Sequence, residues 1–146
     1  MSLHDGSKKM SKSDPNEGSR INLLDDPETI IKKVKRAKSD SYRGIEFHNE
    51  QRPESRNLLM IYSILSGKEI TDLEIEFSET GWGEFKKLIT EQLIASLEPI
   101  QKRYKVLIDD PYELNKILLK GKEKAESIAN DTLNRVKSNL GFFEMD

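Results

Sequence analysis

The sequence of 146 residues contains no cysteine, a single tryptophan and only five prolines. Without cysteine, the chain can form neither a disulfide bond nor a thiolate metal site. No apolar run approaches the roughly 20 residues that a membrane-spanning helix needs, and the first residues lack the apolar segment of a signal peptide. We therefore expect a soluble intracellular protein of the cytoplasm.

A net charge of one sign is also missing, because 24 Lys and Arg residues face 26 Asp and Glu residues, for a formal net charge of −2. This balance excludes a strongly basic nucleic-acid binder and an acidic solvating tail. The charge is nevertheless unevenly spread: residues 1–43 hold ten basic and seven acidic side chains, whereas residues 44–146 hold 14 and 19. The amino-terminal third is therefore the part that we expect to meet phosphate.

The alternation of apolar and polar residues that marks a strand is absent, and apolar residues instead recur every three or four positions, which predicts helices. We expect these over about residues 27–38, from Pro53 to Gly67, behind a capping box formed by Thr71 and Glu74, from Glu84 through Leu107, and from Pro111 to Leu140. The length suits one domain with a modest core. The predicted fold class is all-α, a helical bundle preceded by a flexible loop.

One stretch of that loop needs a chemical explanation, because residues 8–13 crowd three lysines and two serines together. Flexible ammonium groups can close over a polyphosphate, and hydroxyl and backbone N–H groups can complete an anion site. A solvated basic loop without a ligand explains the same composition. The residue types alone leave both interpretations open.

Residues 9–13 read Lys-Met-Ser-Lys-Ser, the KMSKS signature of class I aminoacyl-tRNA synthetases. Positions along nearly the whole chain are similar to those of the bacterial-type tryptophanyl-tRNA synthetase family. They include Asp14-Pro15-Asn16, Leu24-Asp25-Asp26, Arg52-Pro53, Asn57-Leu58-Leu59, Pro99-Ile100 and Lys124-Ala125. Arg56 and Ser39 depart from the family pattern, which commonly has Ser and Thr there, but both lie outside the signature.

The resemblance implies an ATP-dependent, AMP-forming ligase of protein biosynthesis, which activates tryptophan, releases pyrophosphate with Mg²⁺ and charges tRNA(Trp). In this family the signature loop closes on ATP. By position, Lys9 and Lys12 would be the catalytic residues, and Met10, Ser11 and Ser13 would complete the site for the ATP phosphates. The implied partners are tryptophan, ATP and tRNA(Trp), with a homodimeric full-length enzyme, no membrane and no metal ligand in this chain.

The sequence lacks the Rossmann-type catalytic domain of that family. The domain carries a His-x-Gly-His element, and neither of the two histidines, His4 and His48, fits it. We expect a carboxy-terminal fragment that is inactive alone, because its loop lacks the supporting domain. Its expected parts are residues 1–3, a remnant of cloning; residues 4–26, the KMSKS loop region; residues 27–39, a basic helix; and residues 40–146, a helical domain with an anticodon-binding role.

Two other functions fit the composition, a stand-alone helical RNA-binding module and a helical interaction scaffold. The candidate RNA contacts are Lys32, Lys33, Lys35, Arg36, Lys38, Arg43, Arg52, Arg56 and Arg103. For the basic helix, a solvated charged face is the preferred interpretation. We expect Trp82 to anchor packing rather than stack on a base, and Tyr62 and Tyr104 to lie in the core. His4 and His48 are expected in loops without a metal.

Overall fold

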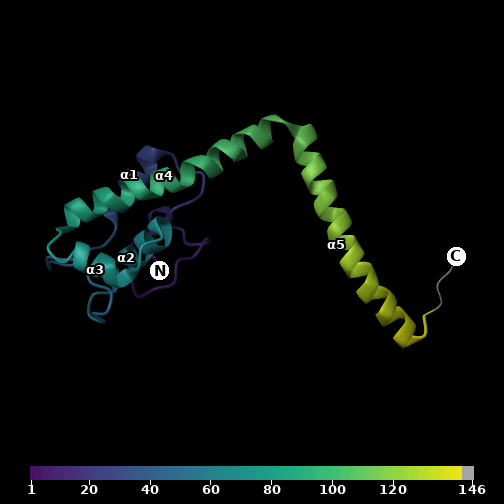
Figure 1. Cartoon of the computed structure of the whole chain (residues 1–146), viewed down its shortest axis with the longest axis horizontal. Coiled ribbons are helices and arrows are strands. Elements are labelled where there is room, and N and C mark those ends of the chain that lie inside the picture. Colours follow the sequence, from purple (N-terminus) through teal and green to yellow (C-terminus); the bar gives the residue numbers. More distant parts are fainter. Residues whose placement is uncertain (143–146) are drawn as a thin grey trace. The chain divides into compact units, whose positions relative to one another are not determined.

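The computed structural model describes residues 1–142, and the described residues form helices and no strand. The chain divides into two compact units, Met1–Gln101 and Lys102–Asp146. The helices are the 3₁₀ helix η1 (Glu17–Ser19) and the α-helices α1 (Pro27–Arg36), α2 (Pro53–Ser66), α3 (Ile70–Glu76), α4 (Trp82–Asp109) and α5 (Pro111–Leu140) (Figure 1). The predicted all-α class is confirmed, although residues 143–146 of the predicted helical domain lie outside the described residues.

Local capping signals place most helix ends where the sequence predicts them. Ahead of α1, Asp26 Oδ1 accepts the backbone N–H of Thr29 at 2.9 Å, and a proline takes the first helical position. Ahead of α5, Asp110 Oδ1 accepts the N–H of Glu113 at 3.1 Å. Glycines in the left-handed conformation close α2 and α5.

The predicted capping box of Thr71 and Glu74 is wrong. The residue that precedes α3 is Glu69, and no side-chain hydrogen bond caps this helix. The Glu74 carboxylate instead accepts the backbone N–H groups of Phe47 at 2.6 Å and of His48 at 3.2 Å. A carboxylate that satisfies a loop 26 and 27 residues away is not available to the start of its own helix.

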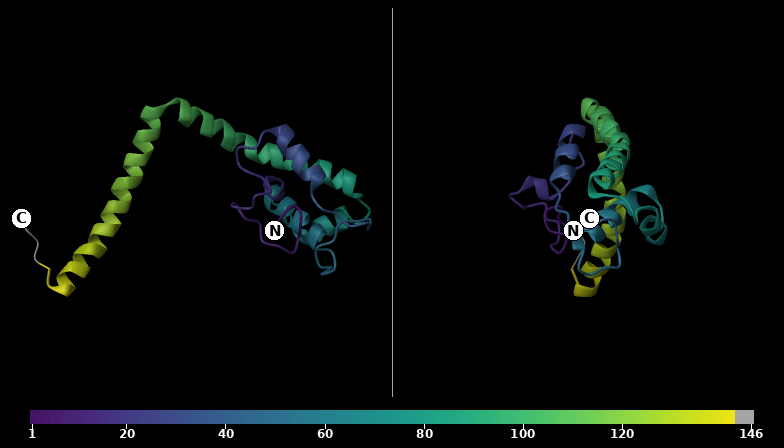
Figure 2. Two further views of the ribbon diagram at one scale, coloured as in Figure 1. Left: turned by 180° about the vertical axis from the view of Figure 1, so that it is seen from behind. Right: turned by 90° about the vertical axis from the view of Figure 1, so that its left-hand side faces the viewer.

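The core lies in the first unit, where α1, α2 and α3 pack beside the first part of α4 (Figure 2). Its buried apolar side chains are Leu3, Ile30, Val34, Ala37, Ile45, Leu58, Leu59, Tyr62, Leu73, Phe77, Phe85, Ile89, Leu93 and Leu97. Tyr62, Phe77 and Phe85 form an aromatic cluster with ring centroids 5.1, 5.3 and 5.9 Å apart, so Tyr62 is a core residue as predicted. Burial of each large side chain contributes about 1.5–3 kcal/mol. This core supports the segment that carries the KMSKS loop region.

Residues 1–3 are built into the first unit. Leu3 is 3 % exposed, its N–H donates to the Ser19 carbonyl at 2.9 Å, and its carbonyl accepts the N–H of Lys38 at 2.8 Å. Ser2 is also buried, and its N–H donates to the Lys8 carbonyl at 2.8 Å. The expectation that these residues are a remnant of cloning stays a prediction.

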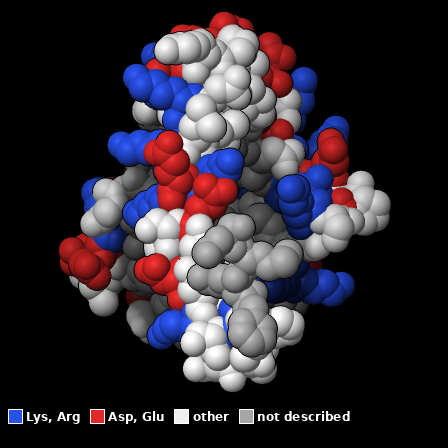
Figure 3. All heavy atoms as spheres, turned by 90° about the vertical axis from the view of Figure 1, so that its right-hand side faces the viewer, with Lys and Arg blue, Asp and Glu red and all other residues white. Residues whose placement is uncertain are grey.

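The second unit has a different character, because α5 contains no buried residue. Its apolar side chains include Leu118, Ile128 and Leu133, all of which are exposed. Tyr104, in the last part of α4, is 44 % exposed, so the prediction that it lies in the core is wrong. A helical period identifies an apolar face but not the surface that covers it. On the face drawn in Figure 3, basic and acidic side chains are interspersed, in keeping with the balanced composition.

Gly44 occupies the turn position with the least room for a side chain. Its φ is +79°, and an added Cβ would lie 2.3 Å from the Ser78 carbonyl oxygen. We expect Gly44→Ala to lower the free energy of unfolding by about 2–3 kcal/mol, since left-handed backbone and a steric clash add up. Urea denaturation measures the change. Gly81→Ala is the matched control, because nothing lies within 4 Å of its added Cβ, and equal losses in the two variants would refute this explanation.

Candidate functional site

Local hydrogen bonds flank the signature motif on both sides within the KMSKS loop region. Before it, the Lys8 N–H donates to the Asp5 carbonyl at 3.0 Å, and the Ser7 hydroxyl donates to the Asp5 carboxylate at 2.5 Å. After it, Asp14 Oδ1 accepts the N–H of Asn16 at 2.8 Å. Local bonds of this kind hold turns without a helix or a sheet. The signature motif, residues 9–13, thus projects from an ordered base.

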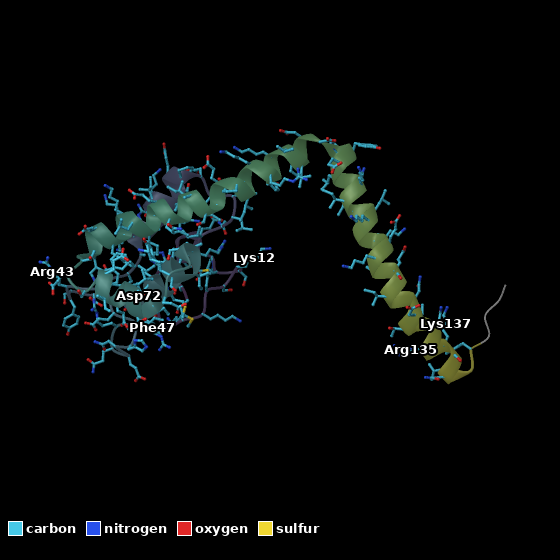
Figure 4. All side chains as sticks on the ribbon, in the orientation of Figure 1. Lys12, Arg43, Phe47, Asp72, Arg135 and Lys137 are labelled. Carbon is cyan, nitrogen blue, oxygen red and sulfur yellow. The ribbon has the colours of Figure 1, made fainter. Side chains whose placement is uncertain are left out.

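The side chains of the signature motif face solvent. Lys9 and Lys12 are exposed, and neither has a hydrogen bond or an ion pair within residues 1–142. The hydroxyls of Ser11 and Ser13 lie 3.1 Å apart, and Met10 is half-buried. Figure 4 shows Lys12 at the outer edge of the loop. Two free ammonium groups beside two hydroxyls can bind the oxygens of a polyphosphate.

Some of the basic side chains in and just after α1 form ion pairs within the first unit. Lys33 is buried and its Nζ lies 2.5 Å from Asp25 Oδ2, while Lys38, just past the helix, pairs with Glu54 at 2.8 Å. Burial acts to raise the pKa of Asp25, but hydrogen bonds from Lys33 and from Asn22 outweigh it and hold the pKa below its usual value. Lys33 is therefore structural and not available for RNA, whereas the Lys38 side chain remains 58 % exposed despite its pair with Glu54.

Arg52 is also structural, which corrects its place among the candidate RNA contacts. It is 2 % exposed, and its guanidinium donates to both carboxylate oxygens of Asp40, at 2.8 and 3.1 Å, and to the Gly44 carbonyl at 2.8 Å. Trp82 Nε1 donates to the same carboxylate at 3.0 Å, so Trp82 anchors packing as predicted. Burial acts to raise the pKa of Asp40, but the hydrogen bonds from Arg52, Trp82 and the backbone of Tyr42 hold it below its usual value.

Three further candidates from the sequence are arginines outside α1. Arg43 lies 3.7 Å from Glu79, with both side chains exposed, and the Arg56 guanidinium lies 5.0 Å from the centre of the Phe47 ring. Arg103 is exposed in the second unit. Within the first unit, Arg43 and Arg56 thus contact different side chains, Glu79 and Phe47.

Lys86 is a supporting residue that the sequence did not reveal. Its Nζ donates to the carbonyls of Ala37, at 2.6 Å, and of Lys35, at 3.2 Å, where α1 ends. A cation favours the carboxyl end of a helix, and here it ties α4 to the helix that follows the loop. Burial lowers the pKa of Lys86. Its partners lie 49 and 51 residues away, so only the fold brings them together.

Within residues 1–142, no group of three or more His, Asp or Glu side chains is placed to hold a metal ion. His48 Nδ1 instead lies 2.8 Å from Glu74 Oε2, and the His4 ring packs against Gly18. No helix in the described part of the chain is both long and apolar enough to cross a membrane.

Comparison with known proteins adds the family. The profile described as "tRNA synthetases class I (W and Y)" matches residues 1–98. A tryptophan-tRNA ligase of Prochlorococcus marinus subsp. pastoris is 74 % identical over 146 residues, which is 100 % of this chain and 43 % of that protein. The chloroplastic/mitochondrial tryptophan-tRNA ligase of Arabidopsis thaliana is 46 % identical over 144 residues, 99 % of this chain and 35 % of that protein.

The fold comparison agrees with the sequence comparison. The crystal structure of tryptophanyl-tRNA synthetase from Mycoplasma pneumoniae superimposes with a TM-score of 0.87 at 29 % identity, over 99 % of this chain and 45 % of that one. The chain thus spans less than half the length of these relatives. The signature motif, the helical framework behind it and these similarities together place the chain in the class I tRNA synthetases of the tryptophan and tyrosine group, with tryptophan-tRNA ligases as its relatives.

Proposed function

We propose that this chain is the carboxy-terminal part of a tryptophan-tRNA ligase, an enzyme that activates tryptophan with ATP and transfers it to tRNA(Trp). The observation that carries the proposal is the signature motif itself, whose Lys9 and Lys12 are exposed and unpaired within the described residues. The 74 % identity to a tryptophan-tRNA ligase over the whole chain supports the choice of tryptophan over tyrosine.

The proposed chemistry is attack by the tryptophan carboxylate on the α-phosphorus of ATP. The bond from that phosphorus to the bridging oxygen breaks, and pyrophosphate leaves with the negative charge. Lys9 and Lys12 would meet this charge as it develops, and such contacts commonly supply 10²–10³-fold in rate, or about 3–4 kcal/mol. Met10, Ser11 and Ser13 would shape the loop around the phosphates.

Three further features are proposed from the family alone. ATP use is proposed from the family. Within residues 1–142 no cluster of side chains is placed to hold Mg²⁺, so we expect Mg²⁺ to arrive bound to ATP. Contact with the tRNA anticodon is assigned to residues 40–146. The full-length enzyme is expected to be a homodimer.

Grafting tests the proposed function. We expect a chimera, in which this chain replaces the matching segment of the Prochlorococcus enzyme, to attach tryptophan to tRNA(Trp) at a rate within about tenfold of its host, because 74 % of the replaced residues are identical. Incorporation of labelled tryptophan into tRNA is the measurement. The chain alone should give no product, since catalysis needs groups held within a fraction of an ångström by a supporting shell. A folded chimera that does not charge tRNA would contradict the proposal.

A further inference from the structure

A polar hollow between the KMSKS loop region and α1 contains none of the signature residues. It has a volume of about 300 Å³ and is lined by His4, Asn16 and Gly18 of the loop region and by Lys32, Lys33 and Arg36 of α1. Thr29 completes the lining, and its hydroxyl is already used as a donor to Asp26 at 2.8 Å. No Asp or Glu side chain lines this pocket, which we call the α1 pocket.

Two of the three long cations of the α1 pocket are available for a ligand. Lys33 is committed to Asp25, as described above. Lys32 lies 3.8 Å from Glu28, but both side chains are more than 70 % exposed, and such surface pairs contribute little. The Arg36 side chain has no hydrogen bond or ion pair within residues 1–142. Lys32 and Arg36 are four residues apart on one helix and therefore share a face.

The loop side of the α1 pocket adds neutral donors. Asn16 Oδ1 accepts the N–H of Gly18 at 3.0 Å, which leaves the Asn16 amide nitrogen free to donate. The His4 ring lies so close to Gly18 that a Cβ added there would be 2.7 Å from His4 Nε2. Glycine thus makes room for an imidazole in the pocket wall.

We propose that the α1 pocket binds a phosphate group, with Arg36 as the principal ligand and Lys32, Asn16 and His4 around it. A guanidinium offers paired N–H donors that match the oxygens of phosphate, and a second cation one helical turn away strengthens the field. The phosphate can belong to an RNA backbone or to a nucleotide. Both sources offer Arg36 a pair of phosphate oxygens that can accept its paired N–H groups. The site lies outside the signature motif and goes beyond the proposed ligase chemistry.

Binding by charge-matched variants tests this site. The chain would be titrated with inorganic pyrophosphate and, separately, with a single-stranded RNA oligonucleotide at two salt concentrations. We expect Arg36→Gln to weaken binding about tenfold, as for loss of a charged hydrogen-bond partner. The control is Lys35→Gln, which removes the same charge from the neighbouring position of α1, outside the pocket. The Lys35 side chain is exposed and has no partner within residues 1–142, and the bond from Lys86 goes to its backbone carbonyl, which the substitution keeps. Its binding should change less than about twofold, by less than about 0.4 kcal/mol.

The two probes also identify the source of the phosphate. If Arg36→Gln loses affinity for RNA alone, and its RNA binding depends less on salt, the result supports a backbone phosphodiester. If Arg36→Gln also loses affinity for pyrophosphate, the result supports a nucleotide phosphate. Equal weakening by Arg36→Gln and Lys35→Gln, or no binding of either probe by the unmodified chain, would overturn the proposal. Neither probe requires tryptophan or turnover, so this result is independent of the ligase activity.

Discussion

Replacing Lys12 with alanine is expected to lower kcat for tryptophan activation by about 10²–10³-fold in the chimeric enzyme. The Lys12 ammonium is exposed and unpaired within the described residues, so its removal should leave the fold intact and take away only the group that we propose to meet the leaving pyrophosphate. Lys9→Ala should act in the same direction. The measurement is the rate of tryptophan-dependent exchange of labelled pyrophosphate into ATP at saturating substrates.

Whether the variant changes kcat or KM separates stabilisation of the transition state from simple attraction of ATP. An interaction made only in the transition state lowers kcat and kcat/KM equally, whereas uniform binding raises KM alone. Lys8→Ala is the control, because Lys8 lies next to the signature motif and pairs with Asp5 at 3.3 Å. It should retain a rate within a few-fold of the unmodified chimera. Equal losses for Lys8→Ala and Lys12→Ala would contradict the assigned role.

Arg52→Ala is expected to lower the free energy of unfolding of the chain by about 3 kcal/mol. It would leave the Asp40 carboxylate with only Trp82 and a backbone N–H as donors, and it would leave the Gly44 carbonyl without its buried donor. Removing one partner of a buried ion pair is far more costly than the net stabilisation of the pair. Chemical denaturation followed by circular dichroism measures the change.

Arg43→Ala provides the matched comparison for that variant. Its ion pair with Glu79 is exposed on both sides, so its loss should change stability by less than about 1 kcal/mol. Arg52→Lys should recover part of the loss, since an ammonium keeps the charge but not the two parallel hydrogen bonds. Similar losses of stability in Arg43→Ala and Arg52→Ala would mean that the contacts of Arg52 and Trp82 with Asp40 do not stabilise the first unit.

The helix ends could be predicted because their causes are local. The Asp26 cap with the proline behind it, and the glycines after α2 and α5, act within a few residues of the ends that they set. The start of α3 could not be predicted in the same way, because Glu74 is engaged by the backbone of residues 47 and 48. The signature motif is identified by its order of residues, and the structure adds that its lysines have no partner among residues 1–142.

The supporting residues of the site depend on contacts that sequence spacing does not encode. Arg52 resembles any other arginine until the fold brings it to Asp40, 12 residues earlier, and Lys86 reaches carbonyls 49 and 51 residues away. Lys33 is likewise distinguished from Lys32 only by the burial of its pair with Asp25. An apolar stripe also does not tell whether its cover belongs to the same chain, which is why Tyr104 was misplaced.

The most direct test of the central claim is tryptophan-dependent exchange of labelled pyrophosphate into ATP by the chimera described above. We predict exchange within about tenfold of the host enzyme, its loss when tryptophan is omitted, and a drop of about 10²–10³-fold when both Lys9 and Lys12 are replaced. A folded chimera that shows no exchange, or full exchange in the absence of both lysines, would contradict the claim that this chain supplies the ATP-phosphate loop of a tryptophan-tRNA ligase.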